Sequence, residues 1–193
     1  MTILISTFYS FEPFLPAMHK YSADKVILIM DKEPKDIVTK ALEKVKNTFG
    51  AVARIEAVKL DGANLYEIAK TMVDLLEKEE GNKIVNVSGG WKLLAQGVLY
   101  GCYARPELVE KIVCNKIEDS TLIELPKLSY NLSSAKRELM EEIVKRNGRS
   151  IVQIAEKLGK TRGMLYQHLK ELKESGYVDE KFEITLAGRM SLL

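Results

Sequence analysis

The sequence predicts an α/β protein in two parts, a Rossmann-like domain with a mostly parallel six-stranded sheet and a C-terminal winged helix-turn-helix domain. Three features predict it. Up to residue 125, short runs rich in β-branched residues alternate with amphipathic runs. A Ser-rich stretch that starts at Pro126 then interrupts the pattern, and the rest of the chain has the apolar spacing of helices. We therefore expect one domain at residues 1–128 and another at 129–193.

The composition is that of a protein able to bury a core, with 46% hydrophobic residues and a mean hydropathy of −0.10. No apolar run approaches the roughly 18 residues of a membrane span, and the start lacks the layout of a signal peptide, so we expect a cytoplasmic protein with no membrane partner. Cys102 and Cys114 are expected to be reduced thiols. With His19 and His168 the only histidines, we expect no metal site and no cofactor.

The net charge of +2 hides a division of the chain. Residues 1–129 carry 17 Lys and Arg against 18 Asp and Glu, whereas residues 130–193 carry 12 against 9. The basic excess thus lies in the C-terminal part. Such a mild excess permits nucleic-acid binding without indicating it by itself.

Six β-rich runs form the predicted sheet. They are residues 3–6, 25–30, 54–60, 83–87, 111–115 and 121–125. Helical crossovers between the first five favour parallel neighbours. The sixth run follows after only residues 117–120, too few for a crossover helix, so it should run antiparallel at the edge of the sheet.

Amphipathic spacing marks two of the crossover helices. In residues 36–49, Ile37, Ala41, Val45 and Phe49 recur every four positions, as on one helical face. The next amphipathic segment repeats this with Leu65, Ile68, Met72, Val73, Leu75 and Leu76.

The motif NVSGGWK, residues 86–92, follows the fourth β-rich run. An open α/β sheet binds ligands where loops of neighbouring strands leave in opposite directions, which in the order 3-2-1-4 lies between the first and fourth strands. We therefore expect a crevice there. Its predicted lining is Ser6, Thr7, Phe8, Tyr9, Ser88, Gly89, Gly90, Trp91 and Lys92.

Several properties of this motif favour an anionic ligand. Two glycines permit positive φ and close backbone approach, and a helix that begins at Trp91 directs free N–H groups toward the crevice. Lys92 adds a positive charge in the first turn of that helix, which the helix dipole disfavours unless an anion offsets it. Trp91 either stacks on a base or covers the sheet. A tight strand-to-helix turn without a ligand remains the simpler alternative.

Familiar cofactor and catalytic patterns are missing from the crevice. The segment STFYSFE after the first strand has no glycine, which a dinucleotide-binding fingerprint requires, and SGGWKL lacks the glycine spacing of a P-loop. Neither NAD nor ATP is therefore indicated. The sequence also offers the crevice no Ser/His/Asp set for nucleophilic catalysis, no paired carboxylates for acid–base catalysis and no Cys/His spacing for a metal ion.

The C-terminal part predicts three helices and a hairpin. The first helix runs from Ser133 or Ser134 to about residue 146, and the second begins with a capping box at residues 150–153 and ends at Gly159. The third ends at Gly176, before a hairpin with its turn at residues 179–181. Expected inward positions are Leu139, Ile143, Val144, Ile151, Ile154, Ala155, Leu158, Leu165, Leu169 and Leu172.

This order of elements is that of a winged helix-turn-helix. The string IAEKLGKTRGMLYQHLKELKESGYV resembles that motif in bacterial and archaeal regulators of the ArsR and MarR type, and ITLAGR resembles their exit from the wing. The resemblance implies double-stranded DNA binding through the third helix in the major groove. A role in dimerisation or protein binding is the alternative.

The outward face of the third helix supplies the predicted DNA contacts. Arg162 and Gln167 are the best base readers, because Arg pairs with guanine and Gln with adenine through two hydrogen bonds. His168 is expected to pack beside the leucines. The full predicted set is Thr161, Arg162, Met164, Tyr166, Gln167 and Lys170. Lys136, Arg137, Arg146 and Arg149 either add phosphate contacts or form a solvated charged face.

The two parts together resemble the CRISPR-associated Rossmann fold (CARF) regulators of archaea. The family's loop N-x-[ST]-G-G-[TW]-K is matched position by position by Asn86, Ser88, Gly89, Gly90, Trp91 and Lys92. Its first-strand loop corresponds to Ser6 and Thr7, although residues 8–11 lack the glycine often found there.

The CARF resemblance implies a homodimer whose paired domains bind cyclic oligoadenylate, commonly the tetra-adenylate, and which controls transcription of CRISPR loci in antiviral defence. A two-fold dimer would bind a palindromic DNA site. The family also contains metal-independent ring nucleases that cleave cyclic oligoadenylate, in which case Lys92 and Ser6 would stabilise the transition state. An adaptor whose helical module binds protein is a third possibility.

Overall fold

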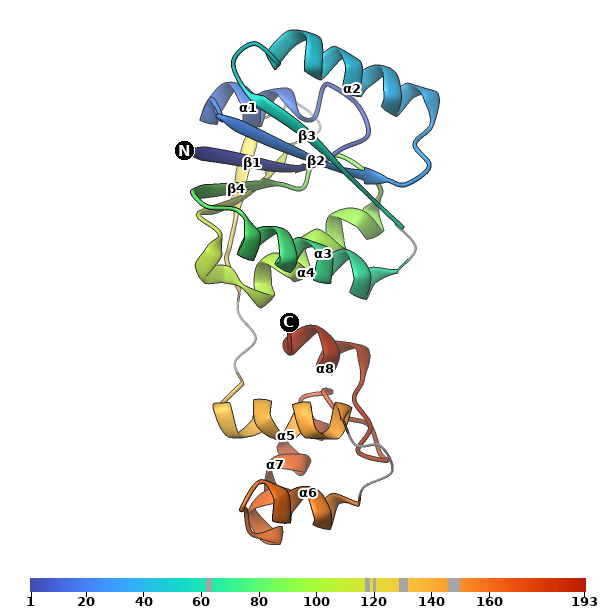
Figure 1. Cartoon of the computed structure of the whole chain (residues 1–193), viewed down its shortest axis with the longest axis vertical. Coiled ribbons are helices and arrows are strands. Elements are labelled where there is room, and N and C mark those ends of the chain that lie inside the picture. The colour runs from blue at the N-terminus through green and yellow to red at the C-terminus, as the bar shows by residue number, and fades with distance from the viewer. Residues whose placement is uncertain (62–63, 117–118, 120, 129–131, 146–149) are drawn as a thin grey trace. The chain divides into compact units, whose positions relative to one another are not determined.

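The computed structural model describes residues 1–61, 64–116, 119, 121–128, 132–145 and 150–193. The chain divides into two compact units, Met1–Ser129 and Tyr130–Leu193 (Figure 1). Each unit has a hydrophobic core of its own side chains. None of the helices in these described ranges combines the length and the apolar character that a membrane crossing requires.

A six-stranded sheet forms the centre of the N-terminal unit. Its strands are β1 (Thr2–Thr7), β2 (Lys25–Asp31), β3 (Arg54–Leu60), β4 (Asn82–Asn86), β5 (Lys111–Asn115) and β6 (Leu122–Leu125). Their order is β3-β2-β1-β4-β5-β6, parallel throughout except for the antiparallel pair β5–β6. The predicted Rossmann-like sheet, its 3-2-1-4 order and its antiparallel edge strand are confirmed. Residues 117, 118 and 120 of the predicted connection lie outside the described residues.

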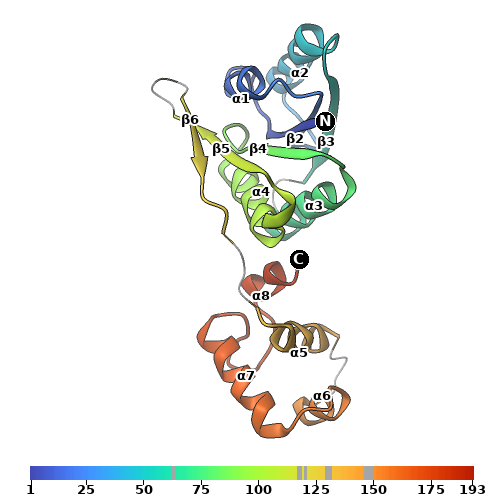
Figure 2. The ribbon, with the colours of Figure 1, turned by 90° about the vertical axis from the view of Figure 1, so that its left-hand side faces the viewer.

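Helices cover both faces of this sheet, as Figure 2 shows. They are α1 (Leu15–Tyr21), α2 (Asp36–Phe49), α3 (Leu65–Lys78) and α4 (Lys92–Ala104), followed by the 3₁₀ turn Pro106–Leu108. Alternate strand residues supply two separate cores, because successive side chains of a strand point to opposite faces. Leu4 packs in the core with α1 and α2, whereas Ile3 and Ile5 pack in the core with α3 and α4.

The helical predictions need two corrections. Ile37 is 53% exposed, and Val38 is buried in its place. A strict spacing of four residues advances about 40° too far at each step of a 3.6-residue helix, so a run from Ile37 to Phe49 drifts off a single face. Helix α1 was not predicted, because its seven residues are too few to show a period.

Glycines allow α3 and α4 to approach closely. A Cβ atom at Gly97 would lie 2.5 Å from Cγ2 of Ile68, and one at Gly101 would lie 2.6 Å from Cβ of Met72. Both partner atoms sit near the backbone of α3, where a side chain cannot simply rotate away. The two helices therefore need hydrogen rather than methyl at these positions of α4.

The turn after β4 is fixed against the end of β1. The hydroxyl of Thr7 donates a hydrogen bond to the carbonyl oxygen of Gly89 at 2.6 Å. A Cβ atom at Gly89 would overlap the carbonyl oxygen of Thr7, and Gly90 has a φ of +76°. Glycine is therefore required at the two positions for different reasons. At Gly89 it permits close backbone approach, and at Gly90 it permits a left-handed conformation.

The C-terminal unit contains α5 (Ser134–Val144), α6 (Ile151–Lys157), α7 (Arg162–Glu174) and α8 (Leu186–Ser191). Ser133 caps α5, and the predicted capping box of Ser150 and Gln153 opens α6. Gly159 and Gly176 follow α6 and α7 with positive φ, which ends each helix as predicted. The predicted hairpin is reduced to a single bridge between Val178 and Ile184.

One predicted core position of this unit is wrong. Val144 is 55% exposed, whereas Leu139, Met140 and Ile143 are buried. These three lie within about 100° of one another around α5, and Val144 falls on the far side of Met140. The other predicted positions pack in the core, with Leu158 only partly buried.

We predict opposite effects for the same substitution in two helices. Gly97→Ala should destabilise the N-terminal unit by about 1–2 kcal/mol, because overpacking against Ile68 outweighs the gain in helix propensity. Gly163→Ala in α7 meets no atom within 4 Å, and should stabilise its unit by up to about 1 kcal/mol. Thermal unfolding followed by circular dichroism measures both; a shift of the same sign in the two variants would contradict the packing described here.

Thr7→Val should also destabilise the N-terminal unit, by about 1–3 kcal/mol, because it leaves the buried Gly89 carbonyl without its donor. Thr2→Val on the same strand is the matched control, since the described residues offer its hydroxyl no hydrogen-bond partner, and it should stay within about 0.5 kcal/mol. Urea unfolding followed by the fluorescence of Trp91, the chain's single tryptophan, compares them. Equal losses would show that the hydroxyl does not hold the turn.

Candidate functional site

Polar side chains of the NVSGGWK turn bind mainly to one another and to the backbone. The side-chain amide of Asn86 donates to Oγ of Ser6 and to the carbonyl oxygen of Pro13, both at 3.2 Å. Its oxygen accepts from the backbone N–H and from the hydroxyl of Ser88. Oγ of Ser88 in turn accepts from the backbone N–H of Asn115 at 2.8 Å. Asn86 and Ser88 together therefore join the ends of three strands, β1, β4 and β5.

This network determines what several predicted site residues contact. Ser6 is fully buried, and its hydroxyl donates to the carbonyl oxygen of Thr7 at 3.1 Å. Thr7 is also buried, with its hydroxyl on the Gly89 carbonyl. Ser88 and Gly89 lie within the turn itself. The structure brings these predicted residues together, but as the frame of the turn.

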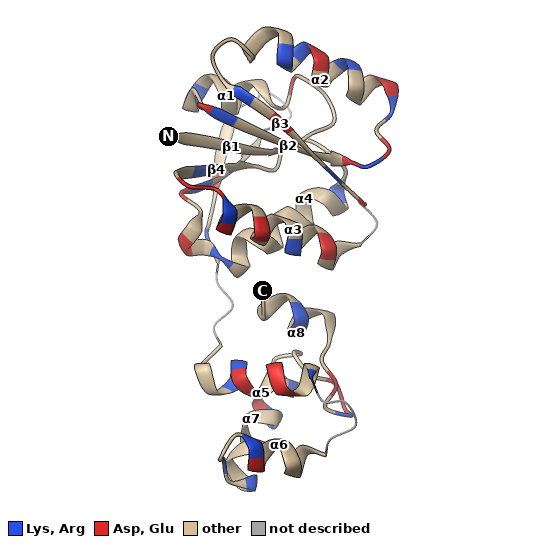
Figure 3. Ribbon diagram, viewed as in Figure 1, with Lys and Arg blue, Asp and Glu red and all other residues tan. Residues whose placement is uncertain are grey.

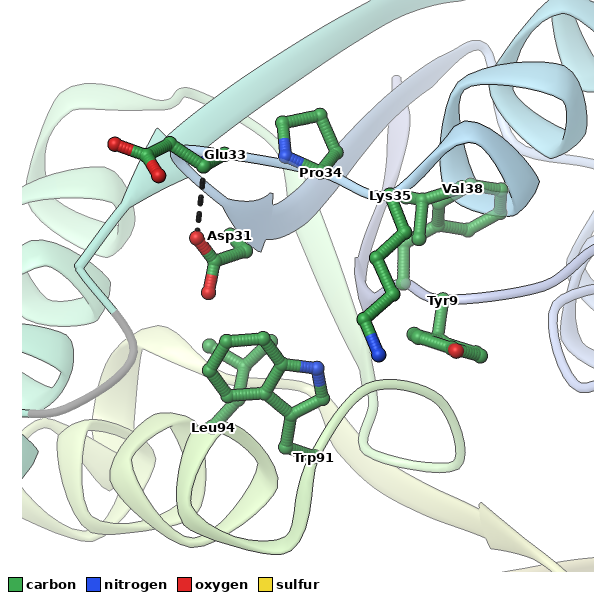
Figure 4. A pocket seen from close by; sticks show the side chains of 9 residues that line it. Tyr9, Asp31, Glu33, Pro34, Lys35, Val38, Trp91 and Leu94 are labelled. Atoms are coloured by element: carbon green, nitrogen blue, oxygen red, sulfur yellow. Dashed lines mark hydrogen bonds between the residues drawn. The ribbon is translucent and has the colours of Figure 1, made fainter.

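A cavity of about 280 Å³ opens beside this frame. Three residues predicted for the crevice, Phe8, Tyr9 and Trp91, line it (Figure 4). Phe8 is buried, and Trp91 is 45% exposed. The remaining lining residues come from the end of β2, from the β2–α2 connection and from helices α2 and α4, namely Asp31, Glu33, Pro34, Lys35, Val38 and Leu94.

No role was predicted for the β2–α2 connection, because the crevice was expected between the loops after the first and fourth strands. A usable signal was present in DKEPK, residues 31–35. These charged residues follow β2, the other neighbour of β1, so they leave the sheet at the same carboxyl edge.

Two helix N-termini reach this cavity without side-chain caps. The N-cap residue of α2 is Lys35 and that of α4 is Trp91; both line the cavity, and neither side chain accepts a hydrogen bond from its helix. Helix α3 differs, because Oδ1 of Asn64 accepts from the N–H groups of Tyr66 and Glu67. Uncapped N–H groups and the positive ends of two helix dipoles favour an anion in or beside the cavity.

The charged side chains of the cavity lie on different sides of Trp91. In Figure 4 the Lys35 amine extends toward Tyr9 and the nitrogen-bearing ring of the indole, whereas the Asp31 carboxylate lies toward its six-membered ring. Oδ1 of Asp31 accepts a hydrogen bond from the backbone N–H of Glu33 at 2.9 Å. Lys92 is exposed in the first turn of α4 and is not among the residues that line the cavity.

The outward face of α7 has the exposure that the sequence predicts. Thr161, Arg162, Met164, Tyr166, Gln167 and Lys170 are all exposed, and the three leucines of the helix are buried. Thr161 caps the helix by accepting from the N–H of Met164 at 3.3 Å. Gln167 donates through Nε2 to Oε1 of Glu171 at 2.8 Å, which leaves its amide oxygen and one amide hydrogen available to a partner.

The residues around α7 are held by polar contacts within the unit. Lys136 pairs with Glu171 at 2.9 Å, and this ammonium, followed by the Gln167 amide, holds the pKa of Glu171 below its usual range. Arg137 donates to the carbonyl oxygens of Leu192 and Ser191. Two of the four predicted flanking cations, Lys136 and Arg137, therefore have partners within the unit. Arg146 and Arg149 lie outside the described residues.

Two other expectations concern residues near these sites. His168 is mostly buried beside the leucines, and neither ring nitrogen has a hydrogen-bond partner among the described residues. Cys102 is buried and Cys114 partly buried, and both are free thiols. Burial raises the pKa of Cys102 well above its usual range, which suits an inert core thiol. No group of His, Cys, Asp and Glu suited to a metal ion occurs within the described ranges.

Several solved structures resemble this fold, among them the following two. Csm6 of Enterococcus italicus, bound to cyclic hexa-2′-fluoro-hexa-dAMP, aligns with 13% identity and a TM-score of 0.52 over 94% of this chain and 56% of that one. Protein VC1899 of Vibrio cholerae aligns with 11% identity and a TM-score of 0.52 over 98% of this chain and 64% of that one. The chain thus spans less than two thirds of either protein, and at these identities the likeness is one of fold.

Sequence comparison separates the same two units. Residues 132–179 match the family model HTH_24, winged helix-turn-helix DNA-binding. No curated protein matches the chain. The N-terminal unit has a CARF-like fold, as the sequence resemblance implied, and carries a winged helix-turn-helix behind it. Since residues 5–115 match the family model described as HFX_2341_N:-like, N-terminal, the chain belongs to that family.

Proposed function

We propose that the protein is a dimeric, CRISPR-associated transcription regulator that binds cyclic oligoadenylate through its N-terminal unit and double-stranded DNA through its C-terminal unit in the cytoplasm. The cavity beside NVSGGWK is the observation that carries this proposal. Its uncapped helix N-termini and Lys35 favour phosphate, and its aromatic wall of Trp91 and Tyr9 favours a base. Csm6, which shares the fold, was solved with a cyclic oligonucleotide of the same class bound.

A homodimer would present two copies of the NVSGGWK turn to one ligand. A cyclic tetra-adenylate has the two-fold symmetry that such an interface requires. The outer face of α4 favours pairing, because Lys92 is the one charged residue of the helix (Figure 3) and Tyr100 is exposed on it. Interfaces are depleted in charge and enriched in tyrosine in this way.

DNA recognition is assigned to the exposed face of α7. Arg162 and Gln167 are proposed to read base edges, and Thr161, Tyr166 and Lys170 to contact phosphates, with Met164 beside them. Two such helices in a dimer suit a palindromic site. Ligand bound across the dimer would change the spacing of the recognition helices and hence the affinity for that site.

The positions of Ser6 and Lys92 do not favour the ring-nuclease alternative. It needs Ser6 and Lys92 at the ligand phosphate, but Ser6 is fully buried with its hydroxyl on the Thr7 carbonyl, and Lys92 lies outside the lining of the cavity. Incubation with labelled cyclic tetra-adenylate should therefore leave the ring intact.

We predict that cyclic tetra-adenylate changes the affinity of the protein for DNA. Duplexes selected by the protein from a random library would be titrated by fluorescence anisotropy at one fixed salt concentration, since phosphate contacts make the affinity salt-dependent. Saturating ligand should shift the Kd by a factor of roughly 5 to 150, the usual range of coupling between two sites. Coinciding curves would rule out ligand control of DNA binding.

We further predict that Arg162→Ala weakens binding to the selected duplex by about tenfold and relaxes the preference for one base, as expected when a guanine contact is lost. Arg189→Ala is the matched control, because it removes the same charge from an exposed position on α8. It should lower the affinity slightly and equally for all sequences. An adaptor that binds protein through this unit would show no difference between the two variants.

A further inference from the structure

The cavity of the N-terminal unit combines opposite charges. Lys35, Asp31 and Glu33 all line it. Lys35 and Asp31 lie on different sides of the Trp91 ring, whereas the Glu33 carboxylate extends away from that ring (Figure 4). A ligand that carried only negative charge would meet the Asp31 carboxylate as well as the Lys35 ammonium. A ligand with a phosphate at one end and an N–H donor at the other matches both. An adenine nucleotide has this chemistry, because its phosphate and the amino group of its base lie at opposite ends of the molecule.

We propose that this cavity holds one nucleotide of the ligand in a single orientation, with its phosphate at Lys35, its adenine against Trp91 and the adenine amino group donating to Asp31. The inference rests on the proposed function and adds how the base is chosen. A volume of about 280 Å³ suits this assignment, because it lies just below the roughly 300–1,000 Å³ of pockets that hold a whole drug-sized molecule. It takes one nucleotide, and the rest of the ring lies outside.

Asp31 is fixed as an acceptor by its own loop. Oδ1 accepts from the backbone N–H of Glu33 at 2.9 Å, and the second carboxylate oxygen has no hydrogen-bond partner in the described part of the chain. The dashed bond in Figure 4 shows this anchoring. An amino group would donate to the second oxygen in a charge-assisted bond, whereas the 6-oxygen of hypoxanthine would face it with an unfavourable acceptor. The geometry therefore discriminates between adenine and hypoxanthine.

Lys35 is the cation of this cavity that remains available. Its ammonium forms no ion pair with any described residue, and its backbone begins α2, so the charge and the helix N-terminus act on the same phosphate. Lys32 on the same connection offers a matched control, because it does not line the cavity. Its Nζ instead lies 3.7 Å from Oδ2 of Asp61. The NVSGGWK motif predicted Lys92 as the phosphate ligand, but Lys35 rather than Lys92 lines the cavity.

Trp91 supplies a direct readout, because it is the chain's single tryptophan and lines the cavity. The full chain would be titrated with cyclic tetra-adenylate and with cyclic tetra-inosinate, with tryptophan fluorescence as the signal. The wild type should bind the adenylate ring at least about tenfold more tightly, the usual effect of a charge-assisted hydrogen bond. This comparison needs no variant.

Asp31→Asn tests the base contact. Asparagine keeps the bond to the Glu33 N–H through its oxygen and places an amide N–H₂ group where the free carboxylate oxygen was. Affinity for cyclic tetra-adenylate should fall about tenfold, and the preference should move toward cyclic tetra-inosinate, whose 6-oxygen accepts from the amide. Lys35→Ala should weaken both rings by a similar factor and reduce the salt dependence of binding, and Lys32→Ala should change either affinity by less than about twofold.

The outcomes separate this inference from the proposed function. Wild-type protein that binds cyclic tetra-adenylate, but shows no preference over tetra-inosinate and no change on Asp31→Asn, overturns the orientation and leaves the regulator proposal standing. Equal losses for Lys35→Ala and Lys32→Ala overturn the phosphate contact. If the wild type binds neither ring, the proposed function itself is wrong. Circular dichroism of each variant confirms that it is folded.

Discussion

The contact between the Thr7 hydroxyl and the Gly89 carbonyl, at 2.6 Å, is the constraint on which the N-terminal unit depends. It joins the end of β1 to the turn after β4 across 82 residues of sequence. Because a Cβ atom at Gly89 would overlap the Thr7 carbonyl oxygen, only glycine at this position lets the turn pack directly against the end of β1. Its position then directs the start of α4, and with it Trp91, toward the cavity.

The helices whose N-termini reach the cavity differ from the other long helices in how they are capped. Among the described helices of more than ten residues, α2 and α4 alone lack a side-chain cap, and their N-caps are the two that line the cavity. A cap is worth about 1 kcal/mol, so its absence leaves N–H groups whose best partner is a ligand. Two helices that lack the preferred N-cap residue at the same cavity are typical of a functional site.

Local patterns made the C-terminal unit the more predictable of the two. Its capping box, its glycine stops and its recognition leucines depend on residues within one or two helical turns. The same holds for the strands of the sheet, whose parallel direction follows from connections long enough to contain a helix. Where prediction was wrong, at Ile37 and Val144, the residue lay next to the buried face, and only packing decides which neighbour turns inward.

The sequence by itself determined the two units, their strands and helices and the glycine turn after β4, because periodicity, caps and glycines act over short distances. The tertiary structure alone decided which polar residues remain open to a ligand. Ser6, Thr7 and Ser88 form hydrogen bonds to Asn86, Gly89 and Asn115, which lie 80, 82 and 27 residues away. Asp31 at the end of β2 and Lys35 at the start of α2 line the cavity instead. Such a division depends on which strands become neighbours, and hydrogen-bond partners 80 or more residues apart leave no local pattern in the sequence.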